Sequence, residues 1–163
     1  MPPMPSSGTP EVASNDHVVL QKYFDVALRQ DGVVWLRRTA EVYGSIEAVH
    51  QAYGEFLKIV DDWVLDRRIK SGGLGTPAKT PMAWLYDVRS APARRNDPEF
   101  ENVVQERRAD LLKRSPILAV LVQTASGKMQ VTRMARTSNA NLTVFDDFED
   151  AVRSCLERMK AEY

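Results

Sequence analysis

The sequence predicts an α/β protein, a single domain with a mostly parallel sheet and one antiparallel strand at its N-terminal edge. Three short segments are almost continuously apolar, as is typical of parallel strands covered on both faces: 82–88 (MAWLYDV), 117–122 (ILAVLV) and 142–145 (LTVF). They alternate with segments in which apolar residues recur every three or four positions, the pattern of amphipathic helices. The 163 residues suit one domain. The expected order is β-β-α-β-α-β-α-β-α, with right-handed crossovers.

The first sixteen residues, MPPMPSSGTPEVASND, are expected to form a disordered tail. Proline, serine and glycine dominate them, and they contain no apolar stretch like that of a secretory signal. The folded domain is therefore expected to span residues 17–160.

A hairpin is expected to open the domain. Val26 and Leu28 alternate with polar residues, Asp31-Gly32 is a turn dipeptide, and 33–39 resumes with β-branched and aromatic residues. Its first strand would be the antiparallel edge of the sheet. An exposed edge of this kind could pair with a second copy, so a homodimer through the edge strand is one expectation.

Two long helices flank the second predicted strand. Ser45 can cap a helix whose apolar stripe runs from Ile46 to Val64, and the Gly- and Pro-rich segment 70–81 ends it. Asp97-Pro98 opens the next helix, with aspartate as N-cap and proline at the first helical position.

The last third contains two more strands and two more helices. TASG (124–127) turns the chain after strand 117–122 into a short helix through Met129 and Met134. After strand 142–145, Asp146 or Asp147 caps a final helix whose apolar stripe includes Cys155.

Composition argues against several classes of function. Lysine plus arginine equals aspartate plus glutamate at 22 each, whereas general nucleic-acid binders need a basic excess, so no nucleic-acid partner is expected. No apolar run approaches the ~20 residues of a membrane span. The single cysteine rules out an internal disulfide and no metal-type Cys/His spacing exists, so we expect a cytoplasmic protein without metal or cofactor.

Residues for catalysis are hard to assemble. A nucleophile needs a neighbouring base, but His17 lies at the tail boundary and His50 in the body of a helix, and Cys155 belongs to an apolar stripe. The pair Asp146-Asp147 is explained by helix capping, and Asp61-Asp62 is expected on a solvated helix face. We therefore expect no enzyme.

Ligands of open parallel sheets favour the carboxyl ends of the strands. The TASGK turn there offers Thr124, Ser126, Gly127 and Lys128 at the start of a helix, where backbone N–H groups attract anions. It lacks the second glycine of a Walker loop. It predicts, as the alternative function, a small-ligand or nucleotide sensor.

The loop after strand 82–88 carries the densest basic cluster. Arg89, Arg94 and Arg95 surround Ser90, and Arg133 could extend the patch. Arginine pairs well with carboxylates and phosphates, and loops on rigid scaffolds often carry function. This cluster predicts a docking surface for a protein partner; the alternative is a solvated loop whose arginines pair with Glu99 and Glu101.

The segments VVWLRRTAEVYGSIEAV, WLYDVRSA, LAVLVQTASGKMQVTRMA and LTVFDDFEDAV resemble STAS domains, the family of sulphate transporters and anti-sigma-factor antagonists, and in particular small bacterial STAS-like proteins of unassigned function. A flavodoxin-like domain could show the same alternation. The STAS resemblance implies a binding and regulatory module with a phosphorylatable serine at the start of the helix after a central strand. Ser90 lies at that junction, but the usual Asp-Ser-Ser-Gly type sequence is absent, and the eight residues SAPARRND precede the helical proline.

Overall fold

The computed structural model describes residues 11–12, 18–70, 81–92, 97–123, 129 and 142–163. Within them lies one six-stranded sheet whose strands follow one another in chain order. The strands are β1 (Glu11–Val12), β2 (Phe24–Leu28), β3 (Val33–Arg38), β4 (Ala83–Asp87), β5 (Leu118–Leu121) and β6 (Leu142–Phe145). The helices are α1 (Val18–Tyr23), α2 (Ile46–Lys70), α3 (Pro98–Arg114) and α5 (Phe148–Glu162).

The sheet confirms the predicted α/β class with a parallel body and an antiparallel edge. Strands β3 to β6 are parallel, and β2 pairs with β3 antiparallel. The outermost strand is β1, whose Glu11 and Val12 pair with Leu28 and Ala27 of β2. These two residues belong to the segment expected to be a disordered tail; the rest of 1–16 lies outside the described residues. The predicted edge strand, β2, is therefore second in the sheet.

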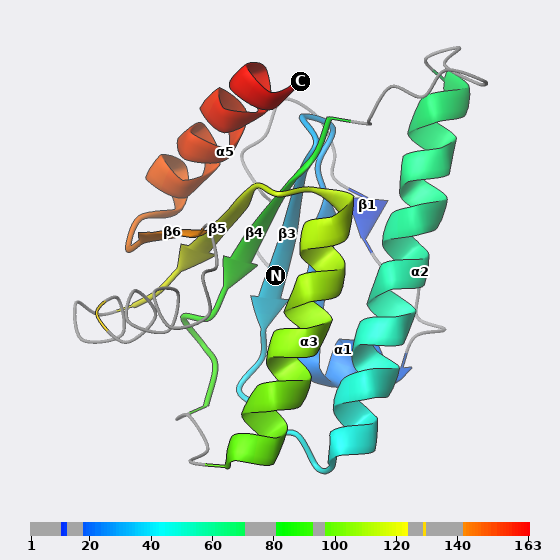
Figure 1. The fold of residues 1–163 in the computed structure, drawn as a ribbon, viewed down its shortest axis with the longest axis vertical. Helices are drawn as coiled ribbons and strands as arrows, with labels where there is room; N and C mark the ends of the chain where they lie inside the picture. The colour runs from blue at the N-terminus through cyan, green and yellow to red at the C-terminus, as the bar shows by residue number, and fades with distance from the viewer. Residues whose placement is uncertain (1–10, 13–17, 71–80, 93–96, 124–128, 130–141) are drawn as a thin grey trace.

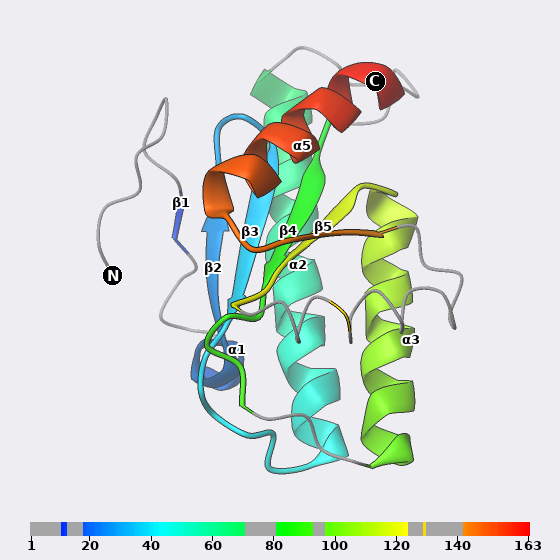
Figure 2. The ribbon, with the colours of Figure 1, turned by 90° about the vertical axis from the view of Figure 1, so that its left-hand side faces the viewer.

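The helices cover the two faces of the sheet. On one face α2 and α3 run side by side, as both views show (Figures 1 and 2), and they pack on residues such as Val34, Leu36 and Trp84. On the other face α5 packs on Trp35 and Leu85. Successive residues of a strand point to opposite faces, so each buried strand contributes to two separate hydrophobic clusters. This is why the central strands are apolar almost throughout.

Helix α1 was not predicted, because its residues were read as part of the N-terminal hairpin. Six residues are too few to form a stable helix alone, and contacts distant in sequence hold both ends. The Leu20 N–H donates to Glu55 Oε2 at 2.8 Å. At the other end the carbonyl of Tyr23 accepts from Thr39 N at 2.9 Å and from Arg38 Nη1 at 2.9 Å.

The predicted turn and helix starts are confirmed. Gly32 has φ +96°, and a Cβ there would lie 2.7 Å from Met159 Cε and 2.8 Å from the Pro81 carbonyl oxygen, so only glycine fits the hairpin turn. Ser45 Oγ accepts from Ala48 N, and Asp97 accepts from Glu99 N, both at 3.1 Å. The expected short helix through Met129 and Met134 lies outside the described residues, except for an exposed Met129. None of the helices in the described ranges combines the length and hydropathy of a membrane span.

Candidate functional site

The carboxyl ends of β3 to β6 meet along one edge of the sheet, which we call the rim. Arg37 and Arg38 end β3, Asp87 ends β4, and Asp146 with Asp147 follows β6. Parallel pairing places Arg37 beside Asp87, so these side chains from distant segments share one surface.

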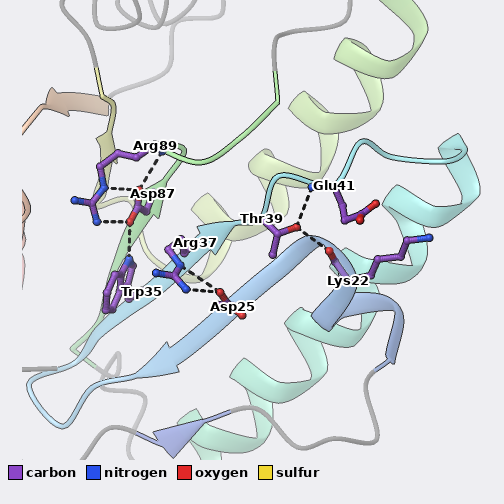
Figure 3. A network of polar contacts seen from close by, with 8 residues as sticks. All are labelled: Lys22, Asp25, Trp35, Arg37, Thr39, Glu41, Asp87 and Arg89. Carbon is purple, nitrogen blue, oxygen red and sulfur yellow. Dashed lines mark hydrogen bonds and ion pairs between the residues drawn. The ribbon is translucent and has the colours of Figure 1, made fainter. Parts of the chain in front are cut away.

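Asp87 is the centre of this surface and has no exposed area. Its carboxylate accepts four hydrogen bonds (Figure 3): from Trp35 Nε1 at 3.1 Å, from the Arg89 backbone N–H at 3.1 Å, and from Arg89 Nε and Nη2 at 3.0 and 2.8 Å. A buried carboxylate is costly unless it is paired and hydrogen-bonded. Here a charged guanidinium and two N–H donors provide that compensation.

Arg89 is fixed by Asp87 yet remains accessible, with 36% of its side chain exposed. The hydrogen bond to Asp87 raises the pKa of Arg89; partial burial opposes the shift, and the negative charges of Asp87 and Asp147 add to it. The guanidinium therefore stays charged and is held in one orientation at the rim.

A second ion pair lies beside the first (Figure 3). Arg37 donates from Nε and Nη2 to Asp25 Oδ2 on β2, at 3.2 and 2.5 Å. The Arg37 guanidinium carbon lies 5.9 Å from the centre of the Trp35 ring. Trp35 thus contacts both pairs, by its Nε1 proton on Asp87 and by its ring next to Arg37.

On the opposite face of the sheet, the polar side chains at the rim hold the fold together. Arg38 is buried, donates to the carbonyls of Tyr23 and Glu41, and stacks 4.3 Å from the Tyr43 ring centre. In the same polar network Thr39 Oγ1 donates to the Lys22 carbonyl at 2.7 Å and accepts from Glu41 N at 3.3 Å (Figure 3). These contacts close the end of α1 and hold the β3–α2 connection.

Buried tyrosines lie below that face. The hydroxyls of Tyr53 and Tyr86 are 3.3 Å apart. Burial is the main cause that raises the pKa of Tyr53 and of Tyr43 well above the usual range. Tyr43 and Tyr53 therefore keep their phenol protons at neutral pH, which suits side chains of the core and not bases.

The predicted docking cluster is described only in part. Arg89 and Ser90 lie at the rim, and Ser90 is exposed in the turn after β4. Arg94, Arg95 and Arg133 lie outside the described residues, as do Thr124, Ser126, Gly127 and Lys128 of the predicted anion-binding turn. Arg89 has Asp87 as its acidic partner, and the alternative pairing with Glu99 and Glu101 stays a prediction for Arg94 and Arg95.

Several residues weighed for catalysis have structural roles. Asp147 is the cap of α5, accepting from Asp150 N at 2.9 Å. Asp61 is not simply solvated, because both its oxygens accept from Arg114. Burial raises the pKa of Cys155 to about 12, and His50 is exposed on α2.

Sequence reasoning missed Asp87, Trp35 and Arg38. Asp87 interrupts an otherwise apolar strand just before Arg89. A charged residue within a buried strand was the sequence feature that could have indicated a buried ion pair. Trp35 is 52 residues away from Asp87 in the chain, and no local pattern joins the two.

Comparison with protein-family models, with curated proteins and with solved structures gives no match for this chain.

Proposed function

We propose that this chain is a non-enzymatic regulatory or adaptor protein that docks a protein partner at the rim, with Arg89 and Ser90 at the centre of the contact. The observation that carries the proposal is the fixed, accessible guanidinium of Arg89 on a fully buried carboxylate. The succession of parallel βα units supports a STAS-like domain, and the single cysteine supports a cytoplasmic location.

An anchored arginine favours binding for a physical reason. Ordering a free arginine on association costs about 0.5–1.5 kcal/mol of side-chain entropy. The Arg89 side chain is already ordered by two hydrogen bonds to Asp87. Within the described part of the chain its Nη1 has no partner, so it can donate to a carboxylate or carbonyl of the partner. Arginine is also enriched among residues that dominate interface energies.

Ser90 gives this surface a means of control. Its hydroxyl is exposed next to Arg89. Phosphorylation would add about −1.5 to −2 charges at pH 7 and would compete with an acidic partner for the guanidinium. We therefore propose that phosphorylation of Ser90 releases the partner.

The proposal is tested by site-specific photo-crosslinking in cells of the source organism. A photoreactive residue replaces Ser90 in one variant and Glu157, exposed on the outer side of α5, in the control. A discrete protein adduct from position 90 and none from position 157 is expected. The same adduct should weaken in an Arg89→Lys background, which keeps the charge but loses the two-pronged geometry. Equal adducts from both positions, or none from position 90, would contradict docking at the rim.

The alternative function, an anion or nucleotide sensor at 124–128, has its own test. Thermal unfolding is measured with ATP and with inorganic phosphate. A rise in the unfolding temperature that Lys128→Ala removes would favour the sensor over the docking protein.

A further inference from the structure

Helix α2 extends past the rest of its layer. Its 25 residues span about 37 Å. Arg114, at the end of α3, donates to Asp61 of α2 at 2.8 and 2.9 Å. Beyond Asp61 the last turns of α2 continue past the end of α3, as both views show (Figures 1 and 2). Among the helices that the structure describes, none of the same layer lies beside these turns.

Two apolar side chains lie on the outer side of these turns. Leu65 and Ile69 are each 52% exposed and one helical turn apart, so they form one apolar surface. On the inner side of the same turns, Trp63 is buried in the core. The guanidinium carbon of Arg67 lies 4.8 Å from the centre of the Trp63 ring. Burial against the sheet accounts for Trp63 but not for the outer pair.

An exposed glycine, Gly54, lies on the same outer side of α2, nearer to the start of the helix. A Cβ at Gly54 would meet nothing within 4 Å, so no described residue requires a glycine there. Glycine in a helix costs about 1 kcal/mol relative to alanine. It leaves the backbone open to close approach by another molecule.

Two exposed charges of opposite sign complete the stripe. Lys58 and Asp62 are exposed, and neither makes an ion pair or side-chain hydrogen bond in the described ranges. Spacings of three and four place Gly54, Lys58, Asp62, Leu65 and Ile69 on neighbouring positions of one side of α2. We call this the α2 outer stripe.

We propose that the α2 outer stripe binds the same stripe of a second copy of this chain, with the two helices antiparallel. In one antiparallel register, Leu65 of the second copy lies over Gly54. In the same register Lys58 lies opposite Asp62 of the second copy, because the midpoint of positions 54 and 65 nearly coincides with that of positions 58 and 62. The two-fold axis repeats each contact. Leu65 of one copy then fills the space beside Gly54 of the other, and Lys58 of each copy pairs with Asp62 of the other.

The charges are the reason for choosing a second copy as the occupant. The stripe presents lysine towards one end and aspartate towards the other, so it complements its own reversed image. A parallel arrangement would oppose like charges. With two apolar side chains on each copy, the contact is smaller than that of an obligate dimer, so we expect weak, concentration-dependent association. This inference does not depend on docking at the rim.

Sedimentation equilibrium of the full chain over a range of concentrations tests the dimer. Lys58→Glu and Asp62→Lys each oppose like charges across the axis and should weaken dimerisation at least about tenfold. The double variant restores opposite charges in exchanged positions and should recover dimerisation to within about threefold of wild type. Leu65→Ser is expected to weaken dimerisation without a charge change.

All these positions are exposed, and thermal unfolding of each variant at low concentration checks that the fold is retained. A chain that stays monomeric up to several hundred micromolar overturns the inference. So does a dimer that survives both single charge reversals unchanged, which would indicate another contact, such as pairing at the sheet edge.

Discussion

Asp87 and Arg89 form an ion pair in which the carboxylate is completely buried and the guanidinium is about one-third exposed. The two residues are separated by one position, so the pair closes a tight bend at the end of β4. Trp35 from the neighbouring strand binds the same carboxylate. The position of Arg89 is therefore set by the sheet and not by the loop that follows it.

Replacing Asp87 should be strongly destabilising. Asp87→Ala leaves the buried Trp35 Nε1 without its acceptor and removes the partner of Arg89, so we expect a loss of about 3 kcal/mol in the free energy of unfolding. Urea unfolding at pH 7 measures it. The matched control is Asp25→Ala, which breaks the more exposed pair with Arg37 and should cost less than about 1 kcal/mol. Similar losses in the two variants would show that the buried pair has no special role.

The Asp61–Arg114 pair predicts a pH-dependent contribution to stability. The hydrogen bond from Arg114 lowers the pKa of Asp61 below its usual range, with partial desolvation opposing the shift. A lowered folded-state pKa means that the stabilisation is present above the unfolded value of about 3.9 and is lost as the pH falls through the folded value. Asp61→Asn should therefore cost about 0.5–1 kcal/mol at pH 7.

The same comparison at low pH is the control. The difference between wild type and Asp61→Asn in urea unfolding should begin to shrink as the pH falls below the unfolded pKa of about 3.9, and it should vanish only once the pH lies below the lowered folded pKa of Asp61. A difference that is the same at pH 7 and pH 3 would mean that the charge of Asp61 is not responsible.

The sequence predicted the strands and long helices well, because their signals are local. Continuous apolar runs marked β4, β5 and β6, and Asp97-Pro98 marked the start of α3. Helix α1 was missed because Glu55 and Thr39, distant in the chain, satisfy its ends. In the site, Arg89 and Ser90 were found from loop composition. The buried carboxylate that positions Arg89 depends on strand pairing, which composition does not reveal.

Two glycines should respond in opposite ways to alanine. Gly54→Ala replaces an exposed helical glycine at a position where an added Cβ meets no described atom, and it should stabilise the chain by about 0.5–1 kcal/mol, or about 1–4 °C. Gly32→Ala forces a side chain into a positive φ against Pro81 and Met159 and should cost about 2 kcal/mol or more. Thermal unfolding at low concentration, where dimers do not contribute, measures both. A destabilised Gly54→Ala would reveal a contact at that position.

Cys155 should be unreactive in the native protein. Burial raises the pKa of its thiol to about 12, and the thiolate is the reactive form. Iodoacetamide at pH 8 should leave the native chain unmodified and alkylate it fully in guanidinium chloride, as mass spectrometry would show. The raised pKa also means that this group's contribution to stability is complete below the unfolded value of about 8.5 and declines as the pH rises towards 12. Rapid alkylation without denaturant would contradict the buried position.

The two aspartates before α5 should differ, although the sequence alone left the cap undecided. Asp147 accepts from Asp150 N, whereas Asp146 is exposed and makes no side-chain hydrogen bond or ion pair among the described residues. Asp147→Ala should cost about 1 kcal/mol in urea unfolding, and Asp146→Ala less than about 0.5 kcal/mol. Because the charge of Asp147 also favours the charged form of Arg89, its loss would affect both α5 and the rim. Equal costs would contradict the assignment of the α5 cap to Asp147 alone.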